Sequence, residues 1–203
     1  MKSTRFPVWL AVAAIGGLLA GALAAHMLSQ RSVALQGGTW LPEPRALPEV
    51  RLEDDAGRVF DASSLRGHPA LLFFGYSRCP DICPATLATL QAVLQRAPAP
   101  GLRVLFVTVD PGHDTPAVLR QYLAAFGPEF TGLHAQNADL ARLLRALGAS
   151  VDPAAPGNGV ALSHSATLYL LDTRGRLVAV FTPPLSAALL AADLQRAARA
   201  DAL

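Results

Sequence analysis

The chain has 203 residues and a mass of 21.3 kDa, a length that suits one domain with its own hydrophobic core. Its two cysteines exclude a disulfide-rich scaffold and any zinc or iron–sulfur site built from four cysteines. The formal net charge is +2, but without Lys2 and Arg5 the remaining 15 basic residues balance 15 acidic ones. The basic character therefore belongs to the N-terminus, and a neutral remainder with no further lysine argues against a nucleic-acid partner.

The first predicted element is a membrane-spanning helix. Pro7–Ala25 is almost wholly apolar, and as a helix its 19 residues rise about 28 Å, close to the thickness of a bilayer's hydrocarbon core. The basic residues before it keep the N-terminus cytoplasmic. We therefore expect residues 1–28 to anchor the chain by a single pass in the cytoplasmic (inner) membrane, with its globular part on the periplasmic side. The alternative is a signal peptide cleaved at the Ala-Leu-Ala sequence of residues 22–24.

Residues 29–48 are predicted to form a linker, because glycine, proline and polar residues mix there without periodicity. Residues 49–203 are expected to form the globular domain. Its predicted strands cover residues 50–52 and 58–60 as a hairpin, then 70–76, 103–109, 166–171 and 177–181. Its predicted helices cover residues 84–96, 115–126, 137–147 and a final segment from about 185.

Local signals support these assignments. Ala70–Tyr76 is a continuous apolar run, which is typical of a central strand covered on both faces. Thr115 followed by proline indicates a helix start, and Asn137 is expected to cap the next helix, which ends at Gly148. The alternation of strands and helices, closing on a hairpin and a helix, predicts a three-layer α/β domain of thioredoxin-like type.

The two cysteines are spaced C-x-x-x-C at the point where the central strand ends and a helix begins. In a helix, Cys79 and Cys83 would place their Cβ atoms about 5–6 Å apart. That spacing lets two sulfurs bind one soft metal ion, or close a disulfide with some local adjustment. A helix N-terminus favours the thiolate, which both metal binding and thiol exchange require. A purely structural disulfide is less favoured, because so short a loop contributes little stability.

A metal would need a third ligand, and the chain contains five histidines. They are His26, His68, His113, His134 and His164. His164 stands apart because it directly precedes the predicted strand 166–171, whose start would lie beside the cysteines in a thioredoxin-like sheet. Two thiolates and one imidazole suit copper, particularly Cu(I), whereas zinc would need water as a fourth ligand.

Four motifs together resemble the Sco/SenC family. They are Phe74-Gly75-Tyr76, Cys79-Pro80-Asp81-Ile82-Cys83-Pro84, Asp110-Pro111-Gly112-His113-Asp114-Thr115-Pro116, and Ser163-His164-Ser165 before a Tyr-Leu-Leu-Asp strand. The resemblance covers residues 47–181, nearly all of the expected domain. It implies a membrane-anchored, thioredoxin-like copper protein that helps to assemble the dinuclear copper centre in subunit II of cytochrome c oxidase.

By this resemblance Cys79, Cys83 and His164 are the copper ligands, for Cu(I), Cu(II) or both. Two positions depart from the family pattern, which usually has arginine at His113 and often aspartate at Ser163. Neither departure removes a ligand. Asp110 and Asp114 are interpreted as structural, the first ending a strand and the second supporting the cap of the following helix.

Two functions follow as hypotheses. The first is a metallochaperone that passes copper to subunit II or to a related exported cuproprotein, after receiving it from an upstream donor. The second is a thiol–disulfide reductase in which Cys79 and Cys83 are the redox-active pair and reduce the cysteines of that copper site. A peroxiredoxin-like peroxidase is a more remote alternative. The first involves binding and transfer without turnover of a substrate bond, so the enzyme class stays open.

Overall fold

The computed structural model describes residues 12–21, 34–96, 99–149 and 166–203. The chain divides into two compact units, Met1–Ser32 and Val33–Leu203. In the first unit, residues 12–21 are helical. Within the residues described, no helix has both the length and the apolar character needed to span a membrane. The remainder of the predicted anchor, residues 1–11 and 22–28, lies outside the described residues.

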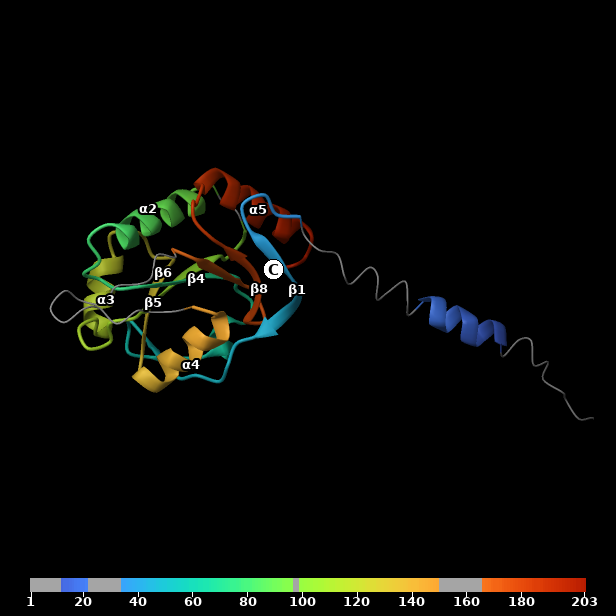
Figure 1. The fold of residues 1–203 in the computed structure, drawn as a ribbon, viewed down its shortest axis with the longest axis horizontal. Coiled ribbons are helices and arrows are strands. Elements are labelled where there is room, and N and C mark those ends of the chain that lie inside the picture. The colour runs from blue at the N-terminus through green and yellow to red at the C-terminus, as the bar shows by residue number, and fades with distance from the viewer. Residues whose placement is uncertain (1–11, 22–33, 97–98, 150–165) are drawn as a thin grey trace, which may run out of the picture. The chain divides into compact units, whose positions relative to one another are not determined.

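The second unit contains, among its described residues, an eight-stranded sheet in the order β1-β8-β7-β4-β5-β6-β2-β3. β1 and β8 lie side by side at one edge of this sheet (Figure 1). The strands are β1 (Thr39–Ala46), β2 (Leu52–Asp54), β3 (Val59–Phe60), β4 (Ala70–Gly75), β5 (Arg103–Thr108), β6 (Phe130–Ala135), β7 (Leu168–Leu171) and β8 (Arg176–Phe181). The helices are the 3₁₀ helix η1 (Ala62–Leu65), α2 (Ile82–Leu94), α3 (Pro116–Leu123), α4 (Asn137–Leu147) and α5 (Ala187–Arg199).

The centre of the sheet is parallel and its flanks are antiparallel. β4 pairs with β5 and β5 with β6 in parallel, whereas β7 runs antiparallel to β4 and β8 antiparallel to β7. All of β4 is buried, as the continuous apolar run predicts. Because β7 is antiparallel to β4, the start of β7 lies at the same edge of the sheet as the end of β4.

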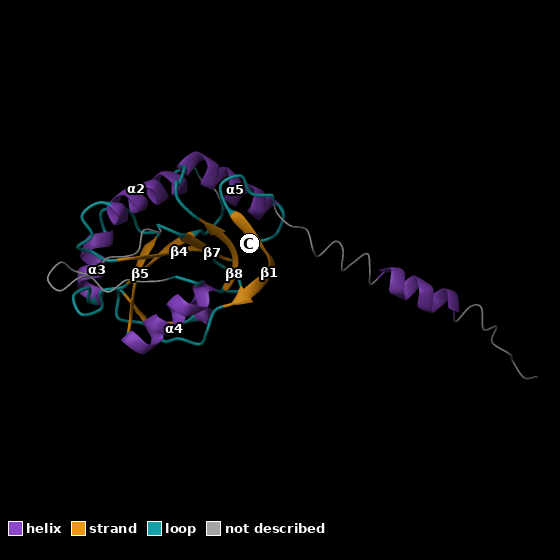
Figure 2. Ribbon diagram, in the orientation of Figure 1, coloured by secondary structure: helices purple, strands orange, loops and turns teal. Residues whose placement is uncertain are grey.

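Helices cover both faces of the sheet, so the predicted three-layer architecture is confirmed (Figure 2). One core lies between the sheet and helices α2, α3 and α5, and it contains the buried side chain of Cys83. The other core lies between the opposite face and α4, whose leucines Leu140, Leu143 and Leu147 are buried. The dithiol segment therefore belongs to the face that three helices cover.

The strand β1 corrects the predicted linker. Residues 39–46 pair antiparallel with β8 instead of connecting two units freely. Pro42 and Pro44 suggested a linker, but proline is compatible with an edge strand that is hydrogen-bonded on one side only. The segment before β1 is also held, because the carboxylate of buried Asp193 on α5 accepts the backbone N–H groups of Gln36 and Gly37.

The strand β6 was not predicted, although it lies between β5 and β2 in the sheet. Thr131, Gly132 and His134 interrupt its apolar pattern. Gly132 is needed for packing, since a Cβ there would lie 2.6 Å from the Cβ of Leu119 on α3. The helix that follows begins at Asn137 itself, so the predicted capping role of Asn137 is wrong. Gln136 is the N-cap, and its side chain makes no capping hydrogen bond.

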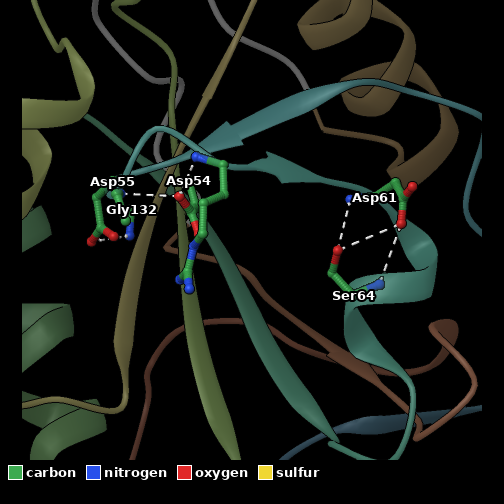
Figure 3. Close-up of polar contacts among 7 residues, drawn as sticks. Asp54, Asp55, Asp61, Ser64 and Gly132 are labelled. Carbon is green, nitrogen blue, oxygen red and sulfur yellow. Dashed lines mark hydrogen bonds and ion pairs between the residues drawn. The ribbon is translucent and has the colours of Figure 1, made fainter.

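The predicted hairpin of residues 50–60 is confirmed, with β2 and β3 paired antiparallel, although its first strand lies at Leu52–Asp54 and not at residues 50–52. In its turn, the carboxylate of Asp54 accepts hydrogen bonds from the backbone of Ala56 and Arg58, and Asp55 accepts the N–H of Gly132 at 3.0 Å (Figure 3). Asp61 and Ser64 cap η1 reciprocally, in the segment between β3 and β4.

Candidate metal centre

Cys79 and Cys83 lie at the junction of β4 and α2, but only Cys83 belongs to the helix. Cys79 precedes the helix, and its Sγ accepts the backbone N–H of Cys83 at 3.3 Å. Asp81, the N-cap residue, makes no side-chain capping bond. The sulfur of Cys79 therefore takes one of the free N–H groups at the start of α2, where partial positive charge favours an anion.

The two thiols, both free, differ in their surroundings. Burial acts to raise the pKa of Cys79, but hydrogen bonds from the backbone of Cys83 and Asp81 and from the Tyr76 side chain outweigh it and lower that pKa. Cys83 is fully buried, and burial, reinforced by the neighbouring Cys79, raises its pKa to about 12. At neutral pH, Cys79 is the more nucleophilic sulfur and Cys83 is a protonated, shielded partner.

Gly75 makes the close approach of Cys83 to the sheet possible. A Cβ at this position would lie 2.5 Å from Cε2 of Phe106 and 3.1 Å from the sulfur of Cys83. The sulfur and the aromatic ring thus meet above the last residue of β4. A larger residue at position 75 would displace one of them.

A second loop braces the cysteine segment. Buried Asp114 accepts hydrogen bonds from the backbone N–H of Ser77 at 2.9 Å and from the hydroxyl of Thr108 at 2.7 Å. Asp114 therefore ties the loop after β4 to the loop after β5. The side chain of Thr115 caps α3, as predicted, and the carboxylate of Asp114 accepts hydrogen bonds from Ser77 and Thr108 instead of supporting that cap. The separation of Ser77 and Asp114 by 37 residues gives no local sequence signal of this contact.

An ion pair adds to this bracing. Arg78 Nη2 lies 2.6 Å from the Oδ2 atom of Asp110, two residues after the end of β5. The side chain of Arg78 is largely exposed. His113, the position at which the family pattern usually has arginine, is exposed in the same loop. Asp110 thus pairs with an arginine from the cysteine motif, and it lies in the loop after β5 instead of ending the strand.

The third predicted ligand, His164, lies outside the described residues, as does Ser163. In the part of the chain that the structure describes, no cluster of three or more histidine, cysteine or acidic side chains could hold a metal ion. The strand β7 begins at Leu168, four residues after His164, and Leu168 is paired with Phe73 near the end of β4. His68, His113 and His134 do not join the cysteines in such a cluster.

A mixed α/β domain with a dithiol at the start of the helix that follows its central strand is a thioredoxin-like protein. The chain belongs to the SCO1/SenC family, since residues 42–199 match the sequence model of that family.

Known relatives agree with this assignment. A SCO2-like protein of Rickettsia prowazekii is 34% identical over 141 residues, which cover 67% of this chain and 69% of the rickettsial protein. ScoI of Bradyrhizobium japonicum, solved with copper bound, is 34% identical, covers 74% of this chain and 98% of its own, and superposes with a TM-score of 0.66. Copper-bound yeast Sco1 is 30% identical with a TM-score of 0.64, covering 73% of this chain and 85% of its own.

Proposed function

We propose that this protein is a copper metallochaperone in which Cys79, Cys83 and His164 bind the ion. The observation that carries the proposal is the pair of free sulfurs at the start of α2, one partly exposed and one buried. Two soft thiolates with one imidazole favour Cu(I). The copper-bound relatives from Bradyrhizobium japonicum and yeast support copper as the cargo.

The position of β7 supports His164 as the third ligand. Leu168 is opposite Phe73, and Phe73 lies two residues before the end of β4. The chain therefore enters β7 at the edge of the sheet that carries the cysteines, four residues after position 164. A span of four residues reaches at most about 14 Å, so a ligand at position 164 has enough chain to reach that edge, which supports the proposal.

The receiver that we propose is the dinuclear copper site of cytochrome c oxidase subunit II, or a related exported cuproprotein. In this proposal residues 1–28 anchor the chain in the cytoplasmic membrane, and the domain faces the extracytoplasmic side. The apolar stretch Pro7–Ala25 and the basic residues before it support this placement. Transfer then proceeds by ligand exchange, and no substrate bond is made or broken.

The different surroundings of the two thiols favour thiol–disulfide exchange as a second candidate function. The thiolate of Cys79 attacks a disulfide of the partner, which forms a mixed disulfide and releases one partner thiolate. Cys83, on losing its proton, then attacks Cys79, which closes the Cys79–Cys83 disulfide and releases the second partner thiolate. Two electrons pass to the partner, and its released thiolates take up protons from water.

Copper transfer tests the first proposal. The full-length chain loaded with one equivalent of Cu(I) is mixed with an apo subunit II domain, and the metal content of each protein is measured after separation. We expect copper to move from the wild-type chain to the receiver, and Cys79→Ser and Cys83→Ser to bind too little copper to transfer. Equal loading and transfer by either serine variant would overturn the proposal.

A further inference from the structure

Tyr122 has an unusual environment on the face of the sheet that holds the dithiol. Among the described residues, its hydroxyl is the buried side-chain polar atom that lacks a hydrogen-bond partner. A buried hydroxyl without a partner costs about 1–3 kcal/mol, so such groups are rare in folded proteins. The hydroxyl of Tyr122 is therefore a donor without an acceptor in the metal-free protein.

The ring of Tyr122 is fixed by its neighbours. It packs against Phe106 and Phe126, with centroid distances of 5.8 Å to each ring. Phe106 is also the ring that meets the sulfur of Cys83 above Gly75. Tyr122 and Cys83 thus belong to the same hydrophobic core, and the ring of Phe106 is a neighbour of both side chains.

The electrostatic environment of Tyr122 agrees with this placement. Burial, followed by the proximity of Cys83, Cys79 and Asp114 when these groups are charged, raises the pKa of Tyr122. The hydroxyl therefore keeps its proton at neutral pH and remains able to donate it in a hydrogen bond. It also lies within the field of both sulfurs.

Cys83 needs such a donor when it carries charge. Its sulfur is fully buried, so water cannot solvate a thiolate there. Cys79 receives a backbone N–H from the start of α2, and the sulfur of Cys83 has a backbone N–H of Tyr76 beside it, so Tyr122 would supply a further donor to the buried sulfur. A metal-bound cysteine is a thiolate, so the charged state of Cys83 arises when the site is loaded.

We propose that the Tyr122 hydroxyl donates a hydrogen bond to the Cys83 sulfur in the metal-loaded site, and so acts as a positioning residue for this ligand. The inference rests on the proposed copper-binding function. Hydrogen bonds to metal ligands orient them and tune their affinity for the metal. Tyr122 lies on α3, 39 residues after Cys83, and no local pattern in the sequence connects the two.

The test compares Tyr122→Phe with the wild-type full-length chain. This variant removes the hydroxyl and keeps the ring between Phe106 and Phe126. Cu(I) affinity is measured by competition with a chromogenic Cu(I) chelator, and the thiolate-to-copper absorption is recorded in the ultraviolet. We expect the affinity to fall about tenfold, the size of a hydrogen bond to a charged group, and the absorption to move to longer wavelength.

Thermal unfolding of the metal-free proteins separates this role from a structural one. Because the hydroxyl has no partner in the metal-free state, Tyr122→Phe should leave the melting temperature unchanged or raise it. Tyr169→Phe is the matched control, since Tyr169 is a buried tyrosine in the core on the opposite face of the sheet. It should leave copper affinity and absorption unchanged.

Three results would overturn the inference. They are an unchanged affinity and absorption in Tyr122→Phe, an equal loss of affinity in Tyr169→Phe, and a clear drop in the melting temperature of metal-free Tyr122→Phe. A wild-type chain that binds no Cu(I) would instead overturn the proposed function, and with it the loaded state on which this inference depends.

Discussion

The backbone N–H of Cys83 donates a hydrogen bond to the sulfur of Cys79 at 3.3 Å, so one cysteine of the pair caps the helix that contains the other. This relationship makes the pair asymmetric. Charge on Cys79 is stabilised by the start of α2, whereas the sulfur of Cys83 points into the core.

The asymmetry predicts different reactivities. In the reduced full-length chain, Cys79 should be alkylated by iodoacetamide much faster than Cys83, because only the thiolate reacts. Since its folded-state pKa is lowered, the rate at Cys79 should rise with pH and level off at a lower pH than the rate of a free cysteine does. Peptide mass spectrometry after timed labelling measures both rates. Equal rates at the two cysteines would contradict this account.

The same shift predicts how stability depends on pH. A group whose folded pKa is lowered stabilises the fold above its unfolded pKa, and this contribution is lost as the pH falls through the folded value. Cys79 should therefore contribute stability above about pH 8.5 that Cys79→Ser lacks. Urea unfolding of both proteins between pH 6 and 9 measures the difference. A difference that is independent of pH would argue against the capping role of the sulfur.

Gly75→Ala should destabilise the domain by about 1–3 kcal/mol, the cost of forcing extra volume into a packed core. The added Cβ would lie 2.5 Å from the ring of Phe106 and 3.1 Å from the sulfur of Cys83. Gly112→Ala is the control, since a Cβ at Gly112 meets no atom within 4 Å. Chemical denaturation measures both variants. A small loss of stability in Gly75→Ala, similar to that of Gly112→Ala, would contradict the prediction, because β4 and the ring of Phe106 would then adjust without cost.

Asp114→Ala should cost about 3 kcal/mol or more, because it removes a buried carboxylate that accepts hydrogen bonds from Ser77 and Thr108. Asp139→Ala, which removes a surface ion pair with Arg142, should cost well under about 1 kcal/mol. The free energy of unfolding of each variant is measured by chemical denaturation and compared with that of the wild-type chain. A loss no larger than that of Asp139→Ala would contradict the bracing role of Asp114.

The sequence predicts the parts of this fold whose signals are local. Every residue of β4 is buried, so the strand needs apolar side chains on both faces. The continuous apolar run Ala70–Tyr76 is therefore recognisable as a buried strand. The strand β6 is missed because Gly132 looks like a turn residue, whereas its small size is required by the close approach of Leu119 on α3. The strand β1 escapes because it is an edge strand that tolerates proline.

The features of the candidate site also separate into those that have a local sequence signal and those that depend on tertiary contacts. Cys79 and Cys83 stand out by their spacing and by their place between strand and helix. The contact of Asp114 with Ser77 joins residues distant in sequence, so it can be found only once the strands are arranged. The asymmetry of the two sulfurs likewise depends on the tertiary burial of Cys83.

The most direct test of the central claim is the copper content of His164→Ala beside the wild-type chain, after loading with Cu(I) and removal of excess metal. His113→Ala is the matched control, since His113 is exposed in the loop beside the cysteine segment. The account predicts one copper per chain in the wild type and in His113→Ala, and a sharp loss in His164→Ala, whose two thiols still exchange with a disulfide. Full copper binding by His164→Ala would contradict it.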